Sequence, residues 1–233
     1  MPKDYLKKYL NIFFGVRNGV YAAPQEKVNF TVETLTYMTP RKLANKITNL
    51  VVQRTTSPRV VIDATAGIGG NALSFLDSDD IAEVILYEKD PDRRRMLQNN
   101  LDLYGCRGSI EKAVIARPPS PTRRRKYTLI DSDQGFTLPP AGFTGTLFID
   151  PPWLPESKTG EDCTEEDYLS ADIKLGDYTL EEILDRSRSC SLILIKVPPN
   201  YVLKYVTNYH INYLRLKKMV IVIASSTKGV PAL

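Results

Sequence analysis

Cysteine and histidine are scarce in this 233-residue chain. It contains three cysteines, Cys106, Cys163 and Cys190, with no close pair among them, and one histidine, His210. This pattern indicates neither a disulfide framework nor a CxxC metal site, so we expect an intracellular, reducing compartment, the nucleus or the cytoplasm. One histidine cannot build a zinc site from imidazoles, and a histidine-dependent triad would have to use His210. We therefore expect no metal.

Long apolar segments are also missing. No run approaches the roughly 20 residues that a membrane-spanning helix needs. The charged start, Met1–Asp4, lacks the apolar stretch of a signal peptide. There are no internal repeats, and we expect no membrane partner. A formal net charge of +4 favours anionic partners only mildly.

The chain does contain a series of short apolar runs with helical patterns between several of them. Such an alternation predicts a doubly wound α/β domain around a parallel sheet. We expect this domain to cover residues 58–233 and an N-terminal helical extension to cover residues 1–57. The apolar runs are residues 60–62, 84–87, 127–130, 146–149, 192–197 and 219–224, and the helices are expected at 3–14, from 71, at 91–104 and at 180–188.

The extension is expected to end in a second helix that enters the main domain. Leu43, Ile47 and Leu50 share one helical face. Thr39 is predicted to cap this helix, and Pro40 to occupy its first position, where a missing N–H costs nothing.

A glycine-rich turn follows the first apolar run. Residues 63–71 read D-A-T-A-G-I-G-G-N. Glycine permits positive φ and close approach of a ligand to the main chain, and nucleotides bind where the first strand of an open α/β sheet ends. The next strand ends at Glu88, where a carboxylate can bind ribose hydroxyls. The spacing excludes a P-loop, and D-x-x-x-G-x-G-G-N is typical of the cofactor turn of methyltransferases.

A second motif, Asp150-Pro151-Pro152-Trp153, follows the buried run at 146–149. Two prolines fix the main chain where the strand ends. A carboxylate together with a proline carbonyl can accept both hydrogens of an exocyclic amine, which is a poor nucleophile because its lone pair is delocalised into the ring. Positioning of this kind supplies most of such catalysis. Trp153 offers a flat surface on which a base can stack, for about 1–3 kcal/mol.

Together these motifs resemble the trimethylguanosine synthases, from about residue 30 onward. The resemblance rests on four segments of the sequence: Met38–Ala44 (M-T-P-R-K-L-A), Asp63–Asn71, Glu88–Pro91 (E-K-D-P) and Asn99–Gly105 (N-N-L-D-L-Y-G). It implies a Rossmann-like class I methyltransferase fold. It also implies transfer of a methyl group from S-adenosyl-L-methionine to the N2 amine of 7-methylguanosine in a capped RNA, with Trp153 stacked on the methylated base.

The expected site has three parts. The catalytic residues are Asp150, Pro151 and Trp153. The substrate-binding residues are Trp153, Pro152 and Asn200, because residues 196–200 end another strand at the same edge of the sheet, where Lys196 is also expected. The cofactor-binding residues are Thr39, Asp63, Ala64, Gly67, Gly69, Asn71, Glu88, Lys89 and Asp150.

The sequence departs from the family at three places. Asp150 stands where the family has serine, Glu88 where it has aspartate, and Ala64–Ala66 where it often has an aromatic residue and a cysteine. Two other functions therefore stay open. One is a different nucleic-acid amino-methyltransferase, acting on adenine N6 or on guanine N2 of ribosomal RNA, and the other is a cap-binding protein with impaired catalysis.

Overall fold

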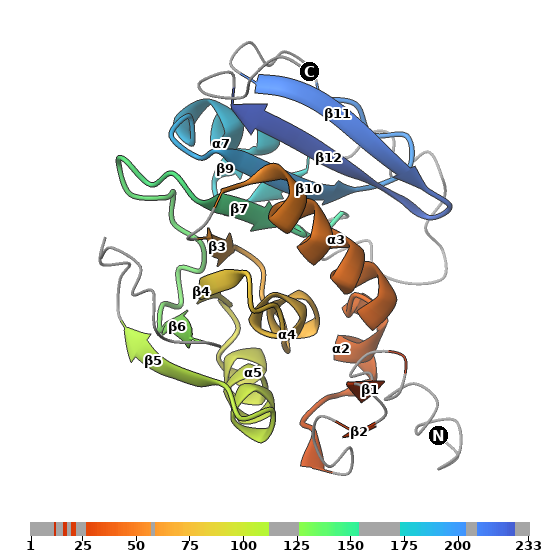
Figure 1. Ribbon diagram of the computed structural model, residues 1–233, viewed down its shortest axis with the longest axis vertical. Helices are drawn as coiled ribbons and strands as arrows, with labels where there is room; N and C mark the ends of the chain where they lie inside the picture. The colour runs from red at the N-terminus through yellow and green to blue at the C-terminus, as the bar shows by residue number, and fades with distance from the viewer. Residues whose placement is uncertain are drawn as a thin grey trace. The chain divides into compact units, whose positions relative to one another are not determined.

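The computed structural model describes residues 12, 16–17, 20–21, 27–56, 59–111, 126–153, 173–203 and 209–226 (Figure 1). Its contacts divide the chain into two compact units, residues 1–135 and 136–233. The helix expected at 3–14 falls almost entirely outside the described residues. The domain boundary at 57/58 stays a prediction.

The first unit contains four parallel strands. They are β3 (Arg59–Asp63), β4 (Ile81–Tyr87), β6 (Lys126–Ile130) and β5 (Arg107–Glu111), hydrogen-bonded in this order. The strands predicted at 60–62, 84–87 and 127–130 are confirmed, and each is largely buried. β5 was not predicted, because its sequence R-G-S-I-E contains no apolar run and its side chains lie mostly exposed.

The helices of this unit are α2 (Val32–Tyr37), α3 (Arg41–Arg54), α4 (Gly70–Leu76) and α5 (Pro91–Leu103), and two short strands, β1 (Val16–Arg17) and β2 (Val20–Tyr21), pair with each other. Every residue of α4 is buried, because α4 packs against α3 as well as against β3 and β4 (Figure 1). A helix covered on all sides needs small or apolar residues, or polar residues that find hydrogen-bond partners, as Asn71 and Ser74 do here. This packing holds the start of α4, and with it the glycine-rich turn, in a rigid setting.

The predicted cap of α3 is wrong by one residue. The helix begins at Arg41, and Pro40 occupies the N-cap position with φ −57° and ψ 139°. The Thr39 hydroxyl instead accepts a hydrogen bond of 3.0 Å from Nδ2 of Asn71, at the start of α4. Thr39 therefore ties the entry of α3 to the glycine-rich turn, which a local capping rule cannot predict.

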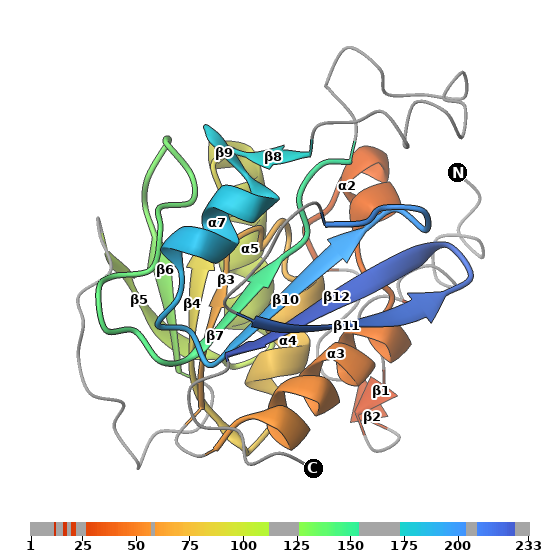
Figure 2. The same ribbon diagram turned by 90° about the horizontal axis from the view of Figure 1, so that it is seen from above.

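The second unit contains β7 (Thr146–Ile149), β10 (Leu192–Val197), β12 (Met219–Ser226) and β11 (Tyr209–Leu216), hydrogen-bonded in this order (Figure 2). β7 and β10 are parallel, but β12 runs antiparallel to both β10 and β11. The strands of this unit are therefore mixed in direction, with the antiparallel pairs at β12. Only Lys217 and Lys218 separate β11 from β12, and a two-residue connection allows only an antiparallel hairpin.

Helix α7 (Leu180–Arg186) lies between β7 and β10 in the chain, after the short paired strands β8 (Lys174–Leu175) and β9 (Tyr178–Thr179). Thr179 caps this helix in a capping box. The hydroxyl of Thr179 accepts from the main-chain N–H of Glu182, and the Glu182 carboxylate accepts from the N–H of Thr179. In the described part of the chain, no helix is long and apolar enough to cross a membrane.

Candidate active site

The glycines of the glycine-rich turn in the first unit are required for different reasons. Gly67 and Gly69 have φ of +55° and +111°, which other residues rarely adopt. A Cβ placed on Gly70 would lie 2.9 Å from Cγ of Met38 and 3.3 Å from main-chain atoms of Thr39, so the glycine permits this close approach. A Cβ on Gly67 would meet no described atom within 4 Å. The main chain at Gly67 is thus accessible to a ligand.

Glu88, directly after β4, holds this turn. Its buried carboxylate accepts a 2.9 Å hydrogen bond from the N–H of Asp90 and a further one from the N–H of Gly67. Burial raises the pKa of Glu88 above its ordinary 4.5, although the two main-chain hydrogen bonds and the charge of Arg93 oppose the rise. The turn is also joined to β4 by a 2.8 Å hydrogen bond from the N–H of Ala66 to the carbonyl of Tyr87. The structure thus brings Glu88 and Gly67 together.

Asn100 of α5 supports the same turn from another direction. Its side chain is completely buried. Nδ2 donates to the carbonyls of Ile68 and Asn29, at 3.0 Å each, and Oδ1 accepts from the N–H of Asn29 at 2.8 Å. Sequence reasoning did not place Asn100 at the site, although it belongs to the motif Asn99–Gly105. Its partners lie 32 and 71 positions away in the chain, too far for a local pattern to reveal them.

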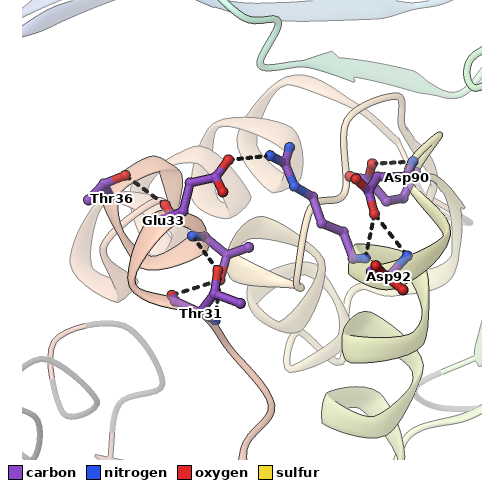
Figure 3. Close-up of polar contacts among 8 residues, drawn as sticks. Thr31, Glu33, Thr36, Asp90 and Asp92 are labelled. Carbon is purple, nitrogen blue, oxygen red and sulfur yellow. Dashed lines mark hydrogen bonds and ion pairs between the residues drawn. The ribbon is translucent and has the colours of Figure 1, made fainter. Parts of the chain in front are cut away.

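The start of α5 is fixed beside Glu88. Oδ1 of Asp90 caps the helix by accepting from the N–H groups of Asp92 and Arg93, at 2.8 and 2.9 Å (Figure 3). The hydrogen bond from Arg93 is the main reason why the pKa of Asp90 lies below its ordinary 3.8. The Arg93 guanidinium pairs with Glu33 of α2 at 3.0 Å (Figure 3). α2 is thereby linked to the helix that follows Glu88.

The other predicted cofactor residues of this unit lie around the turn. Asn71 donates to Thr39, and both are buried. Asp63 is fully buried at the end of β3, where its Oδ1 accepts from the N–H of Thr65 at 3.1 Å. Ala64 is buried, whereas Lys89 is exposed.

In the second unit, Asp150 follows β7 and pairs with Lys196 near the end of the neighbouring strand β10. The Lys196 side chain is 6% exposed and that of Asp150 16%. The main-chain carbonyl of the same Lys196 accepts a 3.2 Å hydrogen bond from Nε1 of Trp153. Asp150 and Trp153 are thus brought together on one residue of β10. The sequence placed Lys196 at this edge of the sheet but did not reveal this pairing.

The remaining residues of this motif differ in exposure. Pro151 is buried, Pro152 is exposed and Trp153 is partly exposed. Asn200 is also exposed, in the segment after β10, and the neighbouring carbonyl of Pro199 accepts from Arg215 of β11 at 3.3 Å. Substrate binding by Pro152 and Asn200 stays a prediction. No group of three or more His, Cys, Asp or Glu in the described ranges is arranged to hold a metal ion.

Comparison with known proteins adds to this geometry. A protein from Listeria monocytogenes, assigned to the class I S-adenosylmethionine-dependent methyltransferases, superposes with a TM-score of 0.51 at 14% identity, over 89% of this chain and 66% of its own. The chain has the class I methyltransferase fold. The predicted fold class is thereby confirmed. A protein from Haemophilus influenzae that is assigned as a methylase superposes with a TM-score of 0.49 at 15% identity, over 79% of this chain and 96% of its own.

Sequence comparison also finds a member of the family that the motifs resemble. The trimethylguanosine synthase of Schizosaccharomyces pombe is 28% identical over 165 residues, which is 69% of this chain. The match spans 59% of that relative's length. No protein-family model matches the chain. The comparisons thus support the suspected resemblance in sequence and the class I methyltransferase fold.

Proposed function

We propose that the protein is an RNA methyltransferase that acts on the exocyclic N2 of 7-methylguanosine in RNA caps. The observation that carries the proposal is the arrangement of Asp150 and Trp153 on Lys196, within the motif Asp150-Pro151-Pro152-Trp153 that directly follows β7. It combines a hydrogen-bond acceptor for an amine with a partly exposed ring for a base. The name of the Schizosaccharomyces pombe relative supports the choice of the cap guanosine.

The first unit is proposed to bind the cofactor. S-adenosyl-L-methionine, when bound, supplies an activated methyl group on a sulfonium centre. Glu88 would accept hydrogen bonds from the ribose hydroxyls. The main chain at Gly67, where an added Cβ would meet no described atom within 4 Å, would lie against the ligand. Thr39 and Asn71, tied to each other beside the turn, and the buried Asp63 would complete this part of the site. Ala64, Gly69 and the exposed Lys89 are proposed as further contacts.

The second unit is proposed to hold the acceptor base. The carboxylate of Asp150 and the carbonyl of Pro151 would accept the two N–H hydrogens of the amine, which favours a pyramidal nitrogen with its lone pair available for attack. Trp153 would stack on the purine. A 7-methylguanine ring carries a positive charge, so a cation–π attraction would add to the stacking. Pro152 and Asn200 would line the base or its ribose.

The test is methyl transfer from labelled S-adenosyl-L-methionine to a 7-methylguanosine cap analogue, with the unmethylated guanosine cap as the matched control. We expect label in the methylated cap at least about tenfold above the control, because cation–π attraction to Trp153 favours the charged base. Digestion to nucleosides and mass spectrometry should place the new methyl group on N2. Equal labelling of the two caps, or labelling of neither, contradicts the proposal.

A second candidate function rests on Asp150. A carboxylate before Pro-Pro is the residue that adenine and guanine amino-methyltransferases generally favour, so the acceptor would then be adenine N6 or guanine N2 in ribosomal RNA. Incubation with uncapped RNA and nucleoside mass spectrometry separates the two. N6-methyladenosine, or N2-methylguanosine at an internal position, would replace the cap as the assigned acceptor.

A third candidate, a cap-binding protein without catalysis, rests on the residue that replaces the family's serine. Calorimetry with the cap analogue and with S-adenosyl-L-methionine distinguishes it. Tight cap binding without cofactor binding and without turnover would favour this function. The buried Glu88 and its hydrogen bond from Gly67 argue instead for a working cofactor site.

A further inference from the structure

The function proposed above gives a role to Asp150 but none to the side chain of Lys196, with which Asp150 forms an ion pair. Both side chains lie largely out of water, with 16% and 6% exposed. An uncompensated charge in such a place is strongly destabilising, so each of the two charges requires a partner. The pair joins the end of β7 to β10, two strands that run parallel and in register through Ile149 and Ile195.

Lys196 also contacts Trp153, the proposed stacking residue of this unit. Its main-chain carbonyl accepts from the indole N–H of Trp153, and that contact does not depend on the lysine side chain. The ammonium group and the carbonyl therefore act on different groups, the first on the proposed amine acceptor and the second on the proposed stacking ring. A substitution of the side chain can separate the two effects.

The chemistry of Asp150 depends on its charge. An ionised carboxylate only accepts hydrogen bonds, whereas a protonated one donates through one oxygen. It offers about four lone-pair positions, so a bond to the ammonium leaves acceptor capacity for an amine hydrogen. The Lys196 ammonium, bound to Oδ2, fixes the rotation of the Asp150 carboxylate.

We propose that Lys196 is the positioning residue of the acceptor site, which holds the carboxylate of Asp150 in the orientation that lets it accept a hydrogen bond from the substrate amine. This inference rests on the proposed function insofar as Asp150 binds an amine. Lys196 itself touches neither the methyl group nor the base in this role. Its effect should therefore appear in kcat rather than in the KM for either substrate.

The test is a cycle of variants measured by methyl transfer and by unfolding. Lys196→Met should lower kcat about 100-fold, the loss typical of a misplaced catalytic group, while both KM values stay within about threefold. Lys196→Arg keeps the positive charge and should recover most of the lost kcat. In an Asp150→Asn background, Lys196→Met should change kcat less than about threefold, because no charge is left to orient.

The matched control is Lys126→Met. Lys126 of β6 pairs with the largely buried Glu83 of β4 at 2.8 Å, with 28% and 11% of the two side chains exposed. The Lys126→Met variant thus loses an ion pair that lies outside the proposed sites. Its kcat should stay within about twofold of the wild type, whatever its loss of stability. A loss of kcat equal to that of Lys196→Met would attribute both losses to general destabilisation and overturn the inference.

Two further results would overturn it: a kcat of Lys196→Met within threefold of the wild type, or an equal effect of Lys196→Met in the wild-type and Asp150→Asn backgrounds. If the wild type labels no cap and no RNA, the proposed function fails. The inference is then decided by the unfolding equilibria of Lys196→Met, Asp150→Asn and the double variant. Coupling that changes the unfolding equilibrium constant about tenfold or more supports it. Additive effects on unfolding refute it.

Discussion

One candidate site is formed mainly by main-chain groups, and the other mainly by side chains. The site in the first unit is mainly main chain: a turn with positive φ at Gly67 and Gly69, held by Glu88 and Asn100 through N–H and carbonyl groups. The site in the second unit is mainly side chain, with Asp150 and Trp153 placed against one lysine of β10.

This difference predicts how each site fails. A main-chain site depends on backbone conformation, so a change that disturbs it should weaken the fold and ligand binding together. A side-chain site stands on strands whose main-chain hydrogen bonds remain when a side chain is shortened. Substitutions there should remove chemistry or affinity while the strands persist, although loss of either partner of the Asp150–Lys196 pair also lowers stability.

The largest effect is expected for Asp150→Ala. Loss of the proposed amine acceptor should lower kcat about 100- to 1,000-fold, the range measured when one preorganised hydrogen-bonding group is removed from an active site. Neither the cofactor Kd nor the cap KM should change more than about threefold. Steady-state kinetics with the cap analogue and calorimetry with the cofactor check this. An unchanged kcat would remove Asp150 from the chemistry.

Trp153→Ala should raise the KM for the methylated cap roughly 5- to 150-fold, which corresponds to the 1–3 kcal/mol that base stacking contributes. Cofactor affinity should not change. Trp153→Phe is the matched control, because it retains a ring but loses the indole N–H bonded to Lys196, and it should lose less affinity than the alanine variant. A collapse of cofactor binding in Trp153→Ala would show that the ring does not stack on the base.

In the first unit, Asn100→Ala should affect folding and binding together. It leaves the carbonyls of Ile68 and Asn29 without this donor, so we expect the free energy of unfolding to fall by about 2–3 kcal/mol and the cofactor Kd to rise about tenfold. Asn99→Ala, on the same helix, removes only a 3.3 Å bond to the carbonyl of Lys27 and a 3.4 Å contact with Asn100. Chemical denaturation should show a loss below about 1 kcal/mol for it. Equal losses would contradict a special role of Asn100.

The contrast between the sites also explains what the sequence could predict. The glycine-rich turn was predictable because positive φ at Gly67 and Gly69 leaves a local mark in the sequence. Six strands, β3, β4, β6, β7, β10 and β12, were predictable because each is composed mainly of consecutive apolar residues. β5 and β11 were missed because they lie at the ends of their strand orders, where exposed polar residues interrupt the pattern.

The side-chain contacts were not predictable in the same way. Asp150 and Lys196 lie 46 positions apart, and Asn29 and Asn100 lie 71 apart. A pattern of apolar residues shows where strands end, but not which polar side chains meet there. Thr39 illustrates the same limit, because a local capping rule assigned its hydroxyl to α3 while the fold gives it to Asn71.

The smallest effect concerns pH and Glu88. Burial raises the pKa of this carboxyl above 4.5, so between 4.5 and the raised value the folded protein binds a proton that the unfolded chain does not. Stability contributed by Glu88 therefore increases as pH falls through this window and is lost as pH rises. Ribose binding needs the ionised form as an acceptor. Cofactor affinity should thus fall as pH decreases through the same window.

Two opposite pH effects from one side chain give a sharp test. Calorimetry should show the cofactor Kd rising as pH falls from neutral into the window above pH 4.5. In the same window, urea unfolding of the free protein should show the wild type gaining stability relative to Glu88→Gln. Glu88→Gln should bind cofactor more weakly at pH 7 and lose most of the pH dependence. Glu111→Gln, on β5, is the matched control and should keep it. If Glu88→Gln retains the full pH dependence of cofactor binding, another group is responsible, and Glu88 supports the turn without contacting the ribose.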